Sequence, residues 1–333
     1  AMGKPDTEFY RADVYGMLRE AVLTLRMRPV FLGVFSYDDR VAPPFEEPFG
    51  GATGGAARDL GARIVADDMQ VGLHGANHMS PGLDGGVTKR FPDRTALAAW
   101  FRAGRASFAA VFGDLERPRV FVPPNDWIDA AGKQALAAEV PEVRVLASVF
   151  TGTDVEAEQD FAPDPDVRGL TDVPRTWAGY VLAGEARLGM VNGVLLYGVS
   201  SHFIHPDDVM DPERSGGLDW ARLRSGFMQG AAEVRKRFPF LRDMEVTEAA
   251  EAIDRLHDLR WRVAAVPGGG MEVVRTAGAG GPVPAFVKTR PGCAPSVEGG
   301  GVVVADPASG LHVVRMDGRV MRVGCAGGHR REP

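Results

Sequence analysis

The feature that most constrains the fold is a repeated order in which a helical pattern is followed by a short, apolar, β-rich run. The helices are expected at 10–27, 57–69 and 95–112, and the strands that follow them at 29–35, 71–73 and 120–122. Gly113, directly after the third helix, is a typical C-terminal stop. Because helical crossovers join the parallel strands of a sheet or barrel, this order predicts an α/β fold.

The pattern continues through the middle of the chain and then changes. Further strands are expected at 143–149 and 194–199, and further helices at 219–238 and 247–259. Residues 262–326 instead carry short β-branched runs separated by glycine- and proline-rich turns, with no helical period. We therefore expect an α/β domain over residues 1–261 and a β-rich accessory segment over residues 262–333.

Charge and hydropathy argue against two classes of partner. The formal net charge is −6, and the 333 residues contain no Lys/Arg run and no aromatic-rich basic stripe of the kind that would track a phosphate backbone. Nucleic acid is therefore not an expected partner. No apolar run approaches the roughly eighteen residues of a membrane-spanning helix, so no transmembrane segment is expected.

The two cysteines, Cys293 and Cys325, both lie in the last segment. A disulfide between them would close a loop long enough to contribute about 3–4 kcal/mol in the chain-entropy model. Two unrelated free thiols are an equally weighted alternative. The cysteines alone therefore do not define the redox compartment.

The strongest chemical signal follows the predicted strand at 71–73. His74 and His78 are four residues apart, which on one helical turn would let both rings face the same ion. Neutral imidazole suits zinc and similar divalent metals. The alternative is a pair of surface histidines in a glycine-containing loop. With seven histidines in the whole chain, their position after a buried strand favours metal binding.

Two further strand ends carry polar side chains, and α/β folds place their sites at such ends. After the strand at 120–122, two prolines precede Asn125 and Asp126, although the residues alone favour an ordinary proline-terminated strand with an Asx turn. After 194–199, two histidines and two carboxylates follow within residues 202–208. If that strand continues, side-chain alternation turns only one histidine toward the site, and we expect it to be His205, with His202 as a packed neighbour.

These segments together resemble the NodB-type polysaccharide deacetylase superfamily. Residues 62–78 are similar to that family's helix, strand and histidine segment, and Pro123-Pro124-Asn125 to its proline-bearing strand end. Residues 201–208 are similar to a serine-to-HPDD signature of the subgroup that contains the PelA deacetylase domain and a fungal galactosaminogalactan deacetylase. The resemblance covers residues 5 to 262 approximately and implies a distorted (β/α) barrel.

The resemblance also implies an activity and roles for individual residues. The activity would be metal-dependent N-deacetylation of an N-acetylhexosamine exopolysaccharide, outside the cell or in the periplasm, with zinc as the expected metal. The implied metal ligands are His74, His78 and Asp39. The implied catalytic residues are Asp38, Asn125 and His205. The implied substrate contacts are Trp127, Trp177, His202 and Asp207.

The chain departs from the family at two points. Val122 stands where the family carries an arginine that orients the catalytic base. Counting back along the chain places the family's first aspartate motif at or before Ala1, so Asp38 and Asp39 can also be read as loop residues at the site mouth. An incomplete metal site would instead make the chain a carbohydrate-binding module, and a metal-dependent hydrolase of small amides is a third possibility.

Overall fold

The computed structural model describes residues 8–45, 51–84, 87–113, 115–150, 159–267, 269–278 and 280–326. The chain divides into two compact units, Ala1–Glu251 and Ala252–Pro333. The predicted boundary after residue 261, between an α/β domain and an accessory segment, stays a prediction. In the described ranges no helix is both long enough and apolar enough to cross a membrane.

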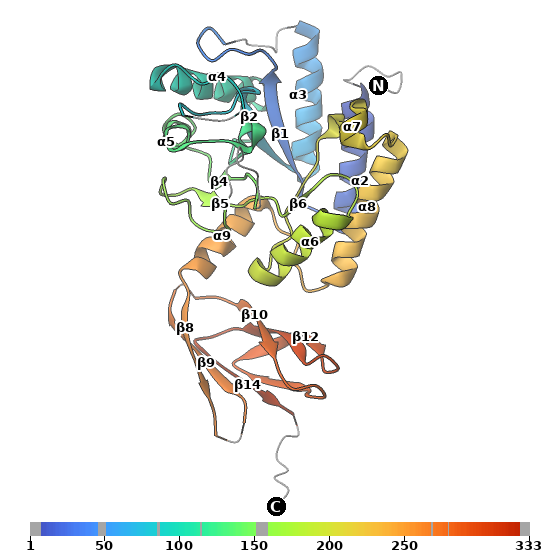
Figure 1. The fold of residues 1–333 in the computed structure, drawn as a ribbon, viewed down its shortest axis with the longest axis vertical. Helices are drawn as coiled ribbons and strands as arrows, with labels where there is room; N and C mark the ends of the chain where they lie inside the picture. The colour runs from blue at the N-terminus through green and yellow to red at the C-terminus, as the bar shows by residue number, and fades with distance from the viewer. Residues whose placement is uncertain are drawn as a thin grey trace, which may run out of the picture. The chain divides into compact units, whose positions relative to one another are not determined.

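The first unit is built on a parallel sheet whose strands follow one another in chain order (Figure 1). The strands are β1 (Val30–Ser36), β2 (Gln70–Asn77), β3 (Val120–Phe121), β4 (Val145–Leu146) and β5 (Thr171–Asp172). This arrangement confirms the α/β prediction. A second, two-stranded parallel sheet joins β6 (Trp177–Ala178) to β7 (His202–Phe203). Within the described ranges these sheets do not close into a barrel, and the last strands are only two residues long.

Helices connect the strands, and their ends follow from local sequence. The bounds are η1 (Phe9–Val14), α2 (Tyr15–Leu25), α3 (Gly51–Ala66), α4 (Arg94–Phe112), η2 (Pro124–Asp126), α5 (Ala130–Glu139), α6 (Gly184–Asn192), η3 (Gly193–Tyr197), η4 (Pro206–Met210), α7 (Pro212–Ser215), α8 (Trp220–Arg237) and α9 (Val246–His257). The side chains of Asp93, Asp129 and Asp219 cap α4, α5 and α8 by accepting hydrogen bonds from first-turn amides. Aspartate at such positions satisfies amide groups that have no partner within the helix.

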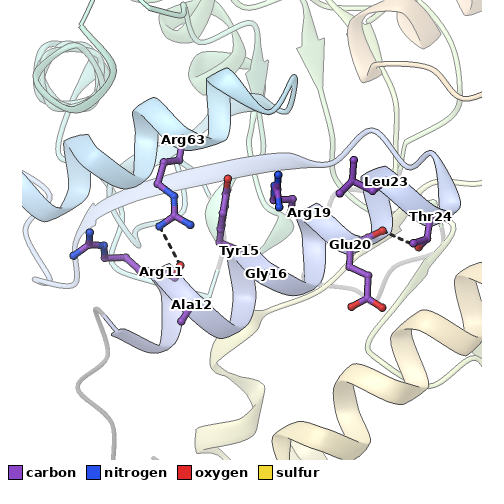
Figure 2. Close-up of a pocket in the computed structure, with 9 residues that line it drawn as sticks. All are labelled: Arg11, Ala12, Tyr15, Gly16, Arg19, Glu20, Leu23, Thr24 and Arg63. Atoms are coloured by element: carbon purple, nitrogen blue, oxygen red, sulfur yellow. Dashed lines mark hydrogen bonds between the residues drawn. The ribbon is translucent and has the colours of Figure 1, made fainter.

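Helix α2 buries one face and leaves a shallow cavity on the other (Figure 2). The buried side chains are Tyr15, Met17 and Ala21. The Arg63 guanidinium reaches across from α3, lies 4.1 Å from the centroid of the Tyr15 ring and donates a hydrogen bond to the Arg11 carbonyl. The cavity beside them has a volume of about 490 Å³ and contains none of the predicted site residues.

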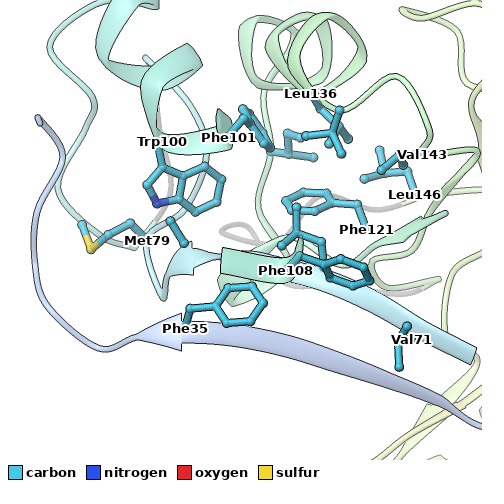
Figure 3. Close-up of a cluster of buried hydrophobic side chains, with 14 of the residues drawn as sticks. Phe35, Val71, Met79, Trp100, Phe101, Phe108, Phe121, Leu136, Val143 and Leu146 are labelled. Carbon is cyan, nitrogen blue, oxygen red and sulfur yellow. The ribbon is translucent and has the colours of Figure 1, made fainter. Parts of the chain in front are cut away.

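The main core of the first unit is aromatic and lies between the parallel sheet and the helices that cover it (Figure 3). Trp100, Phe101 and Phe108 project from α4, and Trp100 and Phe101 meet edge to face. Phe121 from β3 meets Phe101 in the same way, with ring centroids 5.5 Å apart. Burying such rings stabilises the fold by roughly 2–3 kcal/mol each, which fixes the strands that carry the candidate site.

The strand predicted at 194–199 is wrong. Residues 184–197 are helical, as α6 and then η3. Val194 is buried whereas Leu195 and Leu196 are exposed, which is a one-sided helical pattern without strand alternation. A short apolar run cannot distinguish a strand from a helix, and packing against Thr176 decides here, because a Cβ at Gly193 would lie 2.4 Å from its methyl group.

The second unit confirms the prediction of a C-terminal all-β region. Its strands are β8 (Arg260–Ala265), β9 (Met271–Ala277), β10 (Val283–Lys288), β11 (Pro295–Glu298), β12 (Gly300–Asp306), β13 (Leu311–Met316) and β14 (Val320–Cys325). They form two antiparallel sheets, ordered β10-β13-β12 and β11-β14-β9-β8. Cys293 and Cys325 form a disulfide. Of the two alternatives left open by the sequence, the bridge is the one found.

Candidate functional site

The imidazole pair, His74 and His78, lies on and just after a strand, so the expected helical turn is wrong. His74 belongs to β2, and the parallel register with β1 shifts there, because Gly33 pairs with Leu73 and Val34 with Gly75. Gly75 adopts φ +116°, and a Cβ at this position would lie 2.5 Å from the Trp100 ring. The bulge turns the chain so that both imidazoles come together, with their ring centroids 5.1 Å apart.

The His74 ring is held in one orientation and in its neutral form. Its Nδ1 lies 2.8 Å from the Val122 carbonyl oxygen, so Nδ1–H donates and Nε2 keeps its lone pair. Burial first, and the charge of the neighbouring His78 second, lower the pKa of His74 to about 3. A neutral imidazole whose second nitrogen is fixed by a carbonyl is the usual form of a metal ligand.

His78 lies closer to solvent and is covered by a tyrosine. The Tyr37 ring stacks on His78 with centroids 5.9 Å apart and planes 17° apart, and Tyr37 is 76% exposed. Burial lowers the pKa of His78, while the Asp207 carboxylate opposes this shift. Tyr37 was not among the site residues predicted from the sequence. The signal that could have identified it is an aromatic residue directly beside the polar residues that follow a strand.

The two carboxylates that follow β1 have different surroundings. The Asp38 Oδ1 accepts hydrogen bonds from Asn77 Nδ2 at 2.5 Å and from the Arg40 amide at 3.0 Å. Burial opposes ionisation, but these hydrogen bonds lower the pKa of Asp38 below its ordinary value. Its Oδ2 is buried and meets no hydrogen-bond partner in the described part of the chain. The Asp39 side chain is 77% exposed and forms an ion pair with Lys89.

The turn after β3 is strained and tied to a distant arginine. Asn125 and Asp126 both have positive φ, 57° and 53°, which for side-chain-bearing residues costs roughly 1–3 kcal/mol each. Asn125 donates to the Ser80 hydroxyl at 3.2 Å. Both terminal nitrogens of Arg175 contact the Asp126 carboxylate, at 3.2 and 2.7 Å. Arg175 was not predicted as a site residue, because this pairing joins residues far apart in the chain.

The two histidines near residue 202 occupy different environments. The His202 ring stacks on Trp177 with centroids 3.5 Å apart, and its Nε2 lies 2.6 Å from the Gly179 carbonyl oxygen. Strand β7 ends at Phe203, and His205 caps the short helix η4. The Phe203 ring packs edge to face on the His205 ring at 4.7 Å.

His205 lies among charged groups. Its Nδ1 is 4.0 Å from the Asp208 carboxylate, and Arg214 forms ion pairs with both Asp207 and Asp208. Burial lowers the pKa of His205 to about 4, the charge of Arg214 adds to this, and Asp207 opposes it. His74 and His78 lie within electrostatic reach of His205, so the two histidine segments face one region.

The two tryptophans predicted to contact substrate, Trp127 and Trp177, are not exposed on the surface. Trp177 is buried against His202, and its indole nitrogen meets no hydrogen-bond partner in the ranges that the structure describes. Trp127 is half-buried, and its indole nitrogen is likewise without a partner there. The exposed aromatic ring beside the imidazole pair is therefore Tyr37. In the same ranges no three His, Cys, Asp or Glu side chains gather closely enough to hold a metal ion.

The fold and the site together define an α/β protein with a half-buried imidazole pair at the carboxyl end of a parallel strand. A family model described as "Uncharacterised protein conserved in bacteria (DUF2194)" matches residues 1–267. The chain belongs to this family. No curated protein matches it.

Several solved structures are similar to the chain at low identity. A protein from Mycobacterium smegmatis assigned to the polysaccharide deacetylases is 14% identical, with TM-score 0.47, over 76% of this chain and 81% of that one. Agd3, described as a novel carbohydrate deacetylase, is 12% identical with TM-score 0.43 over 94% of this chain, which spans 61% of Agd3. The catalytic domain of the GH30 xylanase C from Talaromyces cellulolyticus is 9% identical with TM-score 0.36, over 94% of this chain and 92% of that domain.

Proposed function

We propose that the chain is a metal-dependent carbohydrate deacetylase that hydrolyses the acetamido groups of an N-acetylhexosamine polymer. The observation that carries the proposal is the hydrogen bond between His74 Nδ1 and the Val122 carbonyl oxygen. It leaves His74 Nε2 unprotonated, next to a second imidazole. The resemblance to the NodB-type superfamily supports the same reading, because it places a metal on these two histidines.

The two imidazoles fit a divalent metal, whereas the two nearby aspartates differ in how well they would serve as a third ligand. His74 and His78 would hold it, since both are imidazoles whose pKa is lowered and which are neutral at neutral pH. The Oδ2 of Asp38 is a buried carboxylate oxygen that has no hydrogen-bond partner in the part of the chain that the structure describes. Asp39 is less suited, because it is exposed and paired with Lys89. When bound, such a metal polarises a carbonyl oxygen and makes water a better nucleophile.

The remaining roles fall to protein side chains. Asp38 has a lowered pKa, so it is ionised at neutral pH and is the carboxylate available to accept the proton of water. His205 is neutral in the free protein and must gain a proton before it can donate one to the departing amine. Asp207 and Asp208 lie beside it and favour the protonated ring. The exposed Tyr37 ring offers a flat apolar surface for a sugar.

An oxidising compartment suits this function. The disulfide between Cys293 and Cys325 is of the kind that persists outside the cell or in the periplasm, where exopolysaccharides are modified. We therefore propose that location. Reducing the protein would be expected to loosen the second unit and leave the imidazole pair unchanged.

Acetate release from an acetylated hexosamine oligomer tests the proposal. The wild type, loaded with zinc, should release acetate, and His74→Ala should lose both metal and activity. His205→Ala should keep its metal and lose roughly 10²–10⁴-fold in turnover, the range typical of a general acid. Equal metal content in wild type and His74→Ala would reject the metal site. Tight glycan binding without acetate release would instead favour the carbohydrate-binding module.

A further inference from the structure

The two halves of the candidate site stand on different sheets. His74 lies on β2 of the five-stranded sheet, whereas His205 follows β7 of the two-stranded sheet. The segment between β5 and β6 crosses from one sheet to the other, and Arg175 lies within it. The relative position of the two histidines therefore depends on how this crossing segment is fixed.

The backbone of Arg175 is bound to the larger sheet. Its amide donates to the Ser148 carbonyl oxygen at 3.0 Å, and its own carbonyl accepts from the Phe150 amide at 3.1 Å. Its neighbour Thr176 donates to the Ser201 carbonyl oxygen at 3.0 Å, which begins the pairing with the β7 segment. Arg175 is thus the last residue held by the first sheet before the chain enters the second.

The side chain of Arg175 binds the short helix η2, which follows β3 of the larger sheet. Both terminal nitrogens contact the Asp126 carboxylate, and the two side chains are 19% and 13% exposed. The Asp126 carbonyl oxygen in turn accepts from the Ser148 hydroxyl at 2.9 Å. A planar guanidinium that binds a carboxylate through two nitrogens has one orientation, which a lysine ammonium cannot reproduce.

The face of the same guanidinium supports the His205 segment. Its central carbon lies 5.1 Å from the centroid of the Phe203 ring. Phe203 packs edge to face on His205, with planes 82° apart.

We infer that Arg175 is a positioning residue that holds His205 in place opposite the imidazole pair, through Asp126 on one side and Phe203 on the other. The inference rests on the proposed function, in which His205 protonates the leaving amine. Arg175 itself contacts no reacting group in this scheme. It sets where the His205 ring lies, and a displacement of about 1 Å at a reacting group can lower turnover on the order of 10²-fold.

The test compares acetate release by zinc-loaded wild type, Arg175→Met, Arg175→Lys and Phe203→Leu. We expect kcat to fall at least about tenfold in Arg175→Met and Phe203→Leu, with KM and metal content nearly unchanged. Arg175→Lys should recover little, because it lacks the two-nitrogen contact. Lys133→Met is the matched control, since it breaks a similarly buried ion pair with Asp164 that belongs to a different side-chain cluster, and should keep its kcat.

A kcat of folded Arg175→Met within twofold of wild type would overturn the inference, as would an equal loss in Lys133→Met. A second readout does not need turnover. The imidazole ¹H–¹⁵N resonances of His205 should shift in Arg175→Met and in Phe203→Leu, whereas those of the buried His312 should not. If the wild type releases no acetate, the proposed function fails. Unshifted His205 resonances in both variants would show separately that Arg175 does not position the ring.

Discussion

Replacing Asp172 with asparagine should stabilise the protein, and more so as the pH rises. Asp172 ends β5, is 5% exposed and lies beside the buried Asp164 carboxylate. Burial first, and the Asp164 charge second, raise the pKa of Asp172 to about 7, although Lys133 opposes the shift. The folded state therefore retains a proton that the unfolded chain releases near its ordinary pKa of 3.8.

The sign follows from this difference. Because the folded protein binds more protons between the two pKa values, its stability falls as the pH rises from about 3.8 to about 7. A pKa difference of one unit corresponds to about 1.4 kcal/mol of unfolding free energy. The loss of unfolding free energy above pH 7 therefore has an upper limit of about 4 kcal/mol. Asparagine cannot ionise, and its side-chain oxygen can still accept the hydrogen bond that Gln159 donates at 3.1 Å. Asp172→Asn should recover most of that loss.

Urea unfolding measures the effect, and tryptophan fluorescence reports on the first unit, which contains Trp100, Trp127, Trp177 and Trp220. The stability advantage of Asp172→Asn over wild type should grow by about 2–3 kcal/mol between about pH 5 and about pH 8. Asp166→Asn is the control, because Asp166 contacts the same Lys133 but is largely exposed and should contribute less than about 1 kcal/mol. An advantage that does not change with pH would refute the reasoning.

Substitutions at three other sites probe the rest of the molecule. Replacing both Cys293 and Cys325 with serine should lower the unfolding free energy of the second unit by about 3–4 kcal/mol in calorimetry, and unchanged stability would contradict the loop-entropy account. Gly75→Ala should destabilise the first unit by more than about 2 kcal/mol in thermal melts, because φ is +116° and the new methyl group meets Trp100; a smaller loss would mean that the bulge can relax. Tyr37→Ala should raise KM for the oligomer roughly five- to tenfold with little change in kcat, whereas Tyr37→Trp should not, and equal KM values would remove the stacking role.

Several long helices were predicted correctly because their signals are local, whereas α5 and α6 were not predicted and η3 lies where a strand was expected. Helix α8 was expected at 219–238 and is found at Trp220–Arg237, with Asp219 as its cap. The strands were harder, because β3, β4 and β5 are held by pairing with neighbours and have only two residues each. The positions of β3 and β4 agree with the strands predicted at 120–122 and 143–149, whereas β5 was not predicted. The shortness of these strands and the open sheet depend on contacts between distant segments.

The candidate site divides in the same way. His74, His78 and His205 were found because each stands next to an apolar run or a proline-rich turn. The bulge in β2 was not predicted, since the same spacing of histidines fits a helical turn. Arg175 was missed because 49 residues separate it from Asp126, and sequence spacing carries no signal of such a contact.

The two-stranded sheet has a consequence for local opening. With two residues in each strand, β6 and β7 share few backbone hydrogen bonds, whereas β2 is paired on both sides. Sub-global opening of the shorter sheet therefore requires much less free energy than unfolding of the core. Amides of Trp177 and Phe203 should exchange with deuterium sooner than those of Val71 and Leu73. The part of the first unit that carries β6 and β7 would then open locally while the rest of that unit stays folded.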